Sequence, residues 1–262
     1  MTEGAPDVTA LRRGAHERAV ARPRRPFAGT VTDRVPRGAA LRRYTPDRRH
    51  PGAAAVFLHG GYGLFGDLEL QDAWCRRAAE TLGVVVLAVD YRLAPEATLD
   101  DAVADALAAV DLLADEGHDL LYLDGDSAGG AVAVLAAERA ARPLAGLLLT
   151  NPNLDLSLET YDDDLPGGPG RELSAFAMRA WTGVDPADAP RLHRSARGLP
   201  PTLVAVGELD SLRPEARALA DACRRDGVPC RLVELPGAEH GFVGTEHAGA
   251  VLAEAAAFLG LG

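Results

Sequence analysis

The sequence predicts an α/β fold in which one mostly parallel sheet carries helices on both faces. Short apolar runs alternate with longer amphipathic or alanine-rich runs, an order typical of strands joined by crossover helices. The run 84–89 is apolar at every position, which indicates a strand buried on both faces. Ligands of such sheets bind beyond the carboxyl ends of the strands. Four reactive side chains directly follow predicted strands: His59, Ser127, Asp210 and His240.

The first 50 residues are rich in arginine and proline and form a lead-in to the main domain, which is expected over 51–262. Within the lead-in we expect a short helix over 10–21. Two edge strands are expected over 30–35 and 39–44, with a turn at Pro36, Arg37 and Gly38.

The main domain alternates strands and helices from Ala53 onward. Strands are expected over 54–58, 84–89, 120–123, 144–149, 202–206 and 230–235. Helices are expected over 69–82, 101–114, 130–141, 214–225 and 245–259. Residues 152–199 interrupt this rhythm with three consecutive aspartates and a glycine-rich run, so we expect an excursion out of the sheet there.

Composition and charge restrict the function classes. The 262 residues suit one large α/β domain or two small ones, and 47% hydrophobic with 25% charged content is ordinary for a globular protein. The net charge of −11 argues against nucleic acid as a main partner. Arginines are dense between Arg12 and Arg49, and a solvated lead-in is favoured over a nucleic-acid-binding arm.

Cysteine usage and hydropathy predict a cytoplasmic protein. The three cysteines, Cys75, Cys223 and Cys230, have no disulfide-framework spacing and no zinc-ligand pattern, so we expect reduced thiols and no metal site. The amino terminus lacks an apolar signal core, and no apolar run reaches 18 residues. We therefore expect no membrane association.

The sequence Gly-Asp-Ser-Ala-Gly-Gly at 125–130 lies between a predicted strand and a predicted helix. Gly125 and Gly129 leave room for a sharp turn that exposes the hydroxyl of Ser127, and the adjacent helix start favours developing negative charge. This G-x-S-x-G pattern is the nucleophile elbow of serine hydrolases, with a plain glycine-rich turn as the alternative.

A serine hydroxyl needs a base to take its proton and a third group to orient that base. In the order expected for this topology, Asp210 follows the strand 202–206 and His240 follows the strand 230–235. Glu208 is the alternative acid. An oxyanion also needs backbone N–H donors. Ala128 supplies one, and the loop His-Gly-Gly-Tyr-Gly at 59–63 supplies the others.

The remaining polar residues near these motifs have other expected roles. His247 lies in the last helical pattern and is expected at the surface. His193 lies in the excursion, where substrate contact is the less favoured alternative. Asp126 adjoins the nucleophile, and we expect its hydrogen bonds to shape the loop.

The chain is similar to the hormone-sensitive-lipase-like branch of the α/β-hydrolases, a group of serine carboxylesterases. The resemblance spans about residues 53–245 and rests on His-Gly-Gly at 59–61, Asp-Tyr-Arg-Leu-Ala-Pro-Glu at 90–96, the elbow at 125–130, Leu-Pro-Pro-Thr at 199–202, Asp210, and His-Gly-Phe at 240–242. It implies an α/β-hydrolase fold, with Ser127 as nucleophile, His240 as base and Asp210 as its partner. It further implies that an oxyanion hole is formed by the N–H groups of Gly61, Tyr62 and Ala128.

Two departures from the family pattern bear on substrate choice. The family's third loop glycine is Tyr62 here, whose ring either narrows the acyl pocket or only packs into the cap. The family's cap corresponds to the lead-in and to residues 152–199, and both are short and low in aromatics. We therefore expect a small, reduced cap and an open site that favours short-acyl or small polar esters.

The expected function is a carboxylesterase that acts on small-molecule esters through an acyl-enzyme, with no metal or organic cofactor. An acyltransferase, a thioesterase or a biosynthetic cyclase would need the same triad and is the main alternative. A non-catalytic ligand-binding member of the fold is a further alternative, although no triad residue is missing. Members of the family often pair through an edge strand or the last helix, and the sequence leaves a homodimer open.

Overall fold

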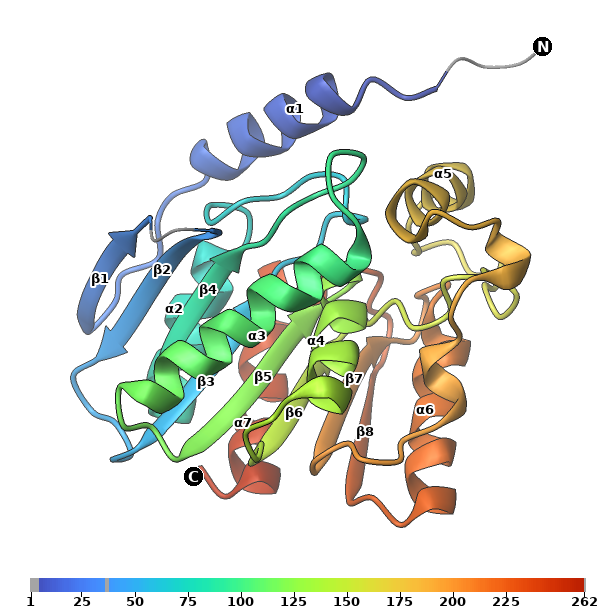
Figure 1. The fold of residues 1–262 in the computed structure, drawn as a ribbon. Coiled ribbons are helices and arrows are strands. Elements are labelled where there is room, and N and C mark those ends of the chain that lie inside the picture. Colours follow the sequence, from blue (N-terminus) through green and yellow to red (C-terminus); the bar gives the residue numbers. More distant parts are fainter. Residues whose placement is uncertain (1–4, 36–37, 262) are drawn as a thin grey trace.

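A computed structural model describes residues 5–35 and 38–261 (Figure 1). Its centre is one sheet of eight strands in the order β1-β2-β4-β3-β5-β6-β7-β8. β1 pairs with β2, and β2 with β4, in antiparallel fashion, and all other pairs are parallel. The strands are β1 (Gly29–Arg34), β2 (Ala40–Pro46), β3 (Ala53–Leu58), β4 (Val85–Asp90), β5 (Leu120–Asp126), β6 (Gly146–Thr150), β7 (Thr202–Gly207) and β8 (Cys230–Leu235).

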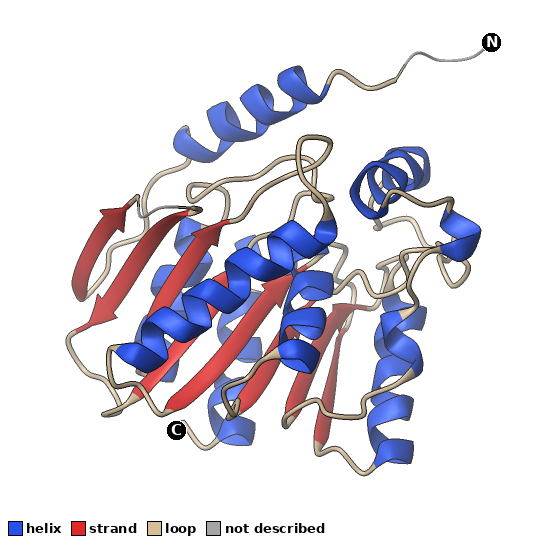
Figure 2. Cartoon of the chain, viewed as in Figure 1, coloured by secondary structure: helices blue, strands red, loops and turns tan. Residues whose placement is uncertain are grey.

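Helices cover both faces of the sheet, which confirms the predicted fold class (Figure 2). One face packs against α3 (Leu99–Asp115), α4 (Ala128–Arg139) and α6 (Arg213–Asp226), and the other packs against α2 (Asp72–Leu82) and α7 (His247–Leu259). Every residue of β3 is buried, because alternate side chains enter the two cores. The continuous apolar runs of the sequence reflect this double burial.

Two element boundaries differ from the sequence prediction for identifiable reasons. β5 continues three residues beyond the expected end, because its pairing with β6 extends to Asp126. Asp124 lies buried inside this strand, where one carboxyl oxygen accepts a hydrogen bond from Trp74 Nε1 at 2.8 Å and burial raises the pKa of the carboxyl to about 8. α2 begins at Asp72 instead of residue 69, because residues 67–71 form turns in which Asp67 Oδ1 accepts the Glu69 N–H.

The lead-in contributes a helix and part of the sheet. α1 (Val8–Val20) lies across the loops at the carboxyl ends of the strands (Figure 1), and Arg12 donates hydrogen bonds to the carbonyl oxygens of Leu64 and Ala94 at 2.8 Å each. β1 and β2 form the antiparallel edge of the sheet. The predicted turn between them falls mainly on residues 36 and 37, which lie outside the described residues.

Residues 152–199 leave the sheet and return to it after forming α5 (Arg171–Thr182) and two short 3₁₀ helices, η1 (Pro186–Asp188) and η2 (Leu192–Arg194). α5 lies at the carboxyl end of the strands (Figure 1). Trp181 of this helix is fully buried, and its ring stacks 6.5 Å from that of Tyr91. Over the described ranges, no helix is long and apolar enough to cross a membrane.

Candidate active site

Ser127 occupies a sharp turn between β5 and α4. Its backbone angles are φ 52° and ψ −117°, a region that residues with a side chain rarely adopt. A Cβ atom at Gly129 would lie 2.0 Å from the carbonyl oxygen of Leu58, and one at Gly125 would lie 2.5 Å from that of Gly129. Only glycine therefore fits at either position, and the strained turn presents the serine hydroxyl at the start of a helix.

The loops after β5, β7 and β8 bring three side chains into a hydrogen-bonded chain. Ser127 Oγ lies 2.9 Å from His240 Nε2, and His240 Nδ1 lies 2.8 Å from Asp210 Oδ2. Because the carboxylate accepts a hydrogen bond from the Nδ1–H group, Nε2 carries the lone pair that faces the serine hydroxyl. Burial acts to lower the pKa of His240, but the charge and hydrogen bond of Asp210 outweigh it and raise the pKa above its usual 6.5.

Asp210 is fully buried, and its second carboxylate oxygen accepts the Leu212 N–H at 3.0 Å. Glu208, the alternative acid, instead accepts the N–H of Gly237 at 2.8 Å. The two alternative histidines lie in other elements, because His193 is buried within the excursion and His247 begins α7. The hydrogen bonds of the His240 imidazole are thus made with Asp210 and Ser127.

The loop after β3 has three consecutive residues with positive φ angles, and the first two of them line the cavity that contains the serine. Gly61 has a φ of 121°, and a Cβ there would lie 2.0 Å from the Phe65 carbonyl oxygen. Tyr62 adopts a φ of 62° despite its side chain. Among the described residues, nothing accepts a hydrogen bond from the N–H groups of Gly61, Tyr62 or Ala128. Such free donors beside the nucleophile suit an oxyanion.

Tyr62 lies between the cavity and the excursion. The residue lines the cavity that contains Ser127, and its ring lies 5.7 Å from the ring of Phe65. Its hydroxyl accepts the N–H of Gly170, at the start of α5, at 3.0 Å. Burial raises the pKa of Tyr62. The side chain therefore joins the loop after β3 to the excursion.

A cavity of about 670 Å³ opens over the serine. The described residues that line it come from four places in the chain: 22–23, 60–74, 126–127 and 240–245. Its wall combines apolar side chains such as Phe65, Leu70 and Val243 with the polar groups around Ser127. A space of this size suits a small molecule. Within the described ranges, no three potential metal ligands cluster together.

Asp126, expected to shape the elbow, accepts three hydrogen bonds. Its partners are Thr150 Oγ1 at 2.7 Å, Asn151 Nδ2 at 3.4 Å and Gln71 Nε2 at 2.5 Å. Burial raises the pKa of this carboxyl, and the charge of His240 and these donors oppose that rise. Gln71 was not anticipated from the sequence, because nothing in its neighbours marks it as part of the site.

The fold and this arrangement define a class of protein. A family model described as the alpha/beta hydrolase fold matches residues 55–244. The chain belongs to this family, in its hormone-sensitive-lipase-like branch, as the sequence motifs predicted.

Its relatives include named ester hydrolases. The chain is 34% identical to the carboxylic ester hydrolase LipN of Mycobacterium tuberculosis, over 90% of this chain and 70% of LipN. It is 30% identical to an ethyl acetate hydrolase of Pseudomonas putida, over 82% of this chain and 74% of that protein. A solved esterase from the archaeon Pyrobaculum calidifontis superposes with a TM-score of 0.85 at 28% identity, over 97% of this chain and 93% of that one.

Proposed function

We propose that this protein is a serine carboxylesterase in which Ser127, His240 and Asp210 form the catalytic triad. The observation that carries the proposal is the hydrogen-bonded chain from the serine hydroxyl through the imidazole to a buried carboxylate. Membership of a family with ester hydrolases among its relatives supports the same reaction.

The reaction follows from the positions of these groups. Ser127 Oγ attacks the ester carbonyl carbon while His240 Nε2 takes the hydroxyl proton. The carbonyl oxygen becomes an oxyanion that the N–H groups of Gly61, Tyr62 and Ala128 stabilise. The C–O bond then breaks, His240 returns the proton to the departing alcohol, and an acyl-enzyme remains. A water molecule then attacks the acyl carbon while His240 Nε2 takes its proton. The bond between the acyl carbon and Ser127 Oγ breaks, His240 returns the proton to Oγ, and the carboxylic acid leaves.

We further propose that the substrates are esters with short acyl chains or small polar groups. The lead-in and residues 152–199 form a small cap in this proposal: α1 rests on the loop that contains Leu64, and α5 begins at the hydroxyl of Tyr62. One relative is an ethyl acetate hydrolase, whose name refers to such a small ester. The cavity volume of about 670 Å³ also suits a small ligand.

Hydrolysis of a series of p-nitrophenyl esters, from acetate to palmitate, tests the proposal. We expect turnover to be greatest for short acyl chains and to vanish in a Ser127→Ala variant with an unchanged melting temperature. Product analysis with added alcohols distinguishes water from another acyl acceptor. Residual turnover by Ser127→Ala, or equal rates on short-chain esters and emulsified long-chain triglyceride, would contradict it.

A further inference from the structure

Gln71 joins the two loops that surround the reacting serine. It lies just before α2, and its side-chain amide reaches between the loop after β3 and the elbow after β5. Gln71 Oε1 accepts the N–H of Gly60 at 2.9 Å, and Gln71 Nε2 donates to Asp126 Oδ2 at 2.5 Å. One side chain therefore connects the residue before Gly61 to the residue before Ser127.

The contact with Gly60 holds the loop directly before its free donors. Gln71 accepts the Gly60 N–H, and the next two N–H groups, of Gly61 and Tyr62, have no acceptor among the described residues. The fit is close, since a Cβ at Gly60 would lie 2.9 Å from Asp126 Oδ2 and 3.2 Å from Ser127 Cβ. A small rotation of the Gly60 peptide would therefore move the donors relative to the serine.

The contact with Asp126 completes the support of the elbow. Thr150 and Asn151 donate to one oxygen of this buried carboxylate, and Gln71 donates to the other. Without the amide, one carboxylate oxygen and the Gly60 N–H would both lose their partners in a largely buried position. Unpaired buried groups of this kind rearrange to find new partners.

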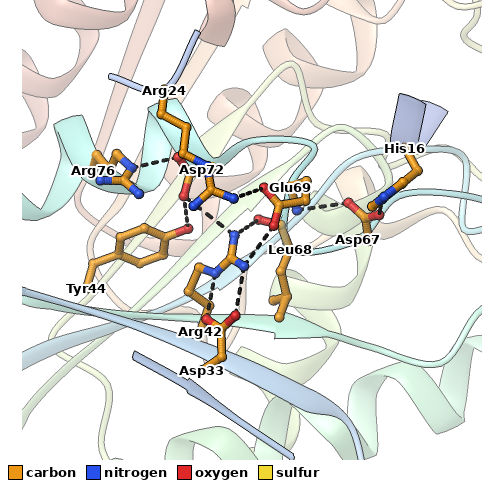
Figure 3. A network of polar contacts seen from close by, with 10 residues as sticks. All are labelled: His16, Arg24, Asp33, Arg42, Tyr44, Asp67, Leu68, Glu69, Asp72 and Arg76. Carbon is orange, nitrogen blue, oxygen red and sulfur yellow. Dashed lines mark hydrogen bonds and ion pairs between the residues drawn. The ribbon is translucent and has the colours of Figure 1, made fainter. Parts of the chain in front are cut away.

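The segment that carries Gln71 is held firmly by a network of charged groups (Figure 3). The buried Arg42 donates to the Leu68 carbonyl oxygen at 3.2 Å and to Glu69 Oε1 at 2.8 Å. Asp72, the residue after Gln71, accepts from Tyr44 at 2.8 Å and from Arg76 at 2.6 Å. Gln71 thus projects from a segment anchored on both sides, which gives its amide a defined position.

We propose that Gln71 is a positioning residue that aligns the oxyanion-binding loop with the nucleophile elbow. The proposal rests on the function proposed above, because alignment matters only if Ser127 attacks an ester. Gln71 lines the cavity over Ser127, but both polar ends of its side chain bind the protein, so it acts through Gly60 and Asp126.

Two substitutions at position 71 test the two halves of the bridge. Gln71→Met keeps the length and removes both hydrogen bonds. Gln71→Glu keeps an acceptor for Gly60 but sets a second carboxylate against that of Asp126. We expect each to lower kcat for p-nitrophenyl butyrate by about ten- to a hundredfold, with KM within about twofold, since small misplacements of reacting groups cost rates of this order. The rate of phosphonylation by a fluorophosphonate should fall in parallel.

Exchanging the amide and the carboxylate between positions 71 and 126 should restore the activity lost in Gln71→Glu. In the double variant Gln71→Glu with Asp126→Asn, the carboxylate placed at position 71 accepts from Gly60 and from the side-chain amide placed at position 126, and one negative charge remains at the site. We expect kcat to recover to within about threefold of the wild type, the non-additivity typical of directly bonded residues. Arg24→Gln is the matched control, because it removes an exposed ion pair with Glu69 on the same segment and leaves the Gln71 contacts intact.

The outcomes separate this inference from the proposed function. A wild-type protein without esterase activity overturns the function itself. An active wild type with an unchanged kcat for Gln71→Met overturns the positioning role. A change in KM that follows acyl length at constant kcat would instead assign Gln71 to substrate contact. A folded double variant with a kcat as low as that of Gln71→Glu also contradicts the proposal. If Gln71→Met fails to fold, the kcat of the double variant alone tests the positioning role.

Discussion

A single glycine of the excursion holds the loops of the acid and the base together, and its substitution by alanine should reduce catalysis strongly. Gly167 N–H donates to the Leu209 carbonyl oxygen at 3.0 Å, and its carbonyl oxygen accepts the His240 N–H at 2.6 Å. The backbone N–H and C=O groups of Gly167 therefore link Leu209, the residue before Asp210, to the proposed base His240.

The size of the effect follows from the space at this position. A Cβ at Gly167 would lie 2.7 Å from Glu239 Cβ, which no side-chain rotation can move away, and 3.0 Å from the Leu209 carbonyl oxygen. Restoring normal contacts of about 3.5 Å requires a retreat of about 1 Å by the loop that carries His240. That movement would stretch the 2.9 Å contact between Ser127 and His240 beyond hydrogen-bonding range. A misplacement of about 1 Å corresponds to a loss of about a hundredfold in kcat.

Steady-state hydrolysis of p-nitrophenyl butyrate by Gly167→Ala tests this reasoning. The matched control is Gly170→Ala in the same segment, where an added Cβ meets no atom within 4 Å and the φ of −62° suits alanine. Overpacking at Gly167 should also lower stability by about 1–3 kcal/mol, which leaves the protein folded at 25 °C. If Gly167→Ala and Gly170→Ala have equal kcat values, the excursion does not position His240 and the reasoning is refuted.

Three further predictions concern the triad and Tyr62. Asp210→Asn should lower kcat by about 10³- to 10⁴-fold, because the imidazole loses the partner that orients it, whereas Glu208→Gln should retain activity. As the pH is lowered, kcat/KM should begin to fall at a midpoint above pH 6.5, since hydrolysis needs neutral His240 and Asp210 raises the pKa of His240. In the residual activity of Asp210→Asn this midpoint should move to lower pH. Tyr62→Gly should shift the p-nitrophenyl ester profile toward longer acyl chains, because Tyr62 lines the cavity. Tyr62→Phe should only loosen the contact with Gly170. An unchanged acyl-length profile for Tyr62→Gly would show that the ring only packs.

Much of the fold was predictable because its signals are local. Each strand of the main domain and each helix packed on the sheet was anticipated from apolar runs and turn residues, since burial on both faces leaves a continuous pattern, whereas α5 in the excursion was not anticipated. The chief errors were at boundaries. β5 outlasted its apolar run because its pairing with β6 extends to Asp126, and its buried Asp124 is hydrogen-bonded by Trp74, fifty residues earlier in the chain. No local pattern reports a partner so distant in sequence.

The proposed triad could be placed from the sequence, but the residues that support it could not. Ser127, Asp210 and His240 follow parallel strands, so the topology alone places them at one edge of the sheet. Gln71 and Gly167 were not anticipated because their contacts join segments separated by many residues and involve backbone groups. The side chain of a glutamine before a helix carries no sign of the loop to which it will bind.

The central claim is that Ser127 is the nucleophile, and labelling by a fluorophosphonate probe tests it most directly. Intact-protein mass spectrometry followed by peptide mapping should show one adduct per chain, located on Ser127 and absent from Ser127→Ala. Prior heat denaturation should abolish the adduct, because labelling depends on the folded contact with His240. A folded protein that remains unlabelled, or one labelled at another residue with Ser127→Ala still active on esters, would contradict the account.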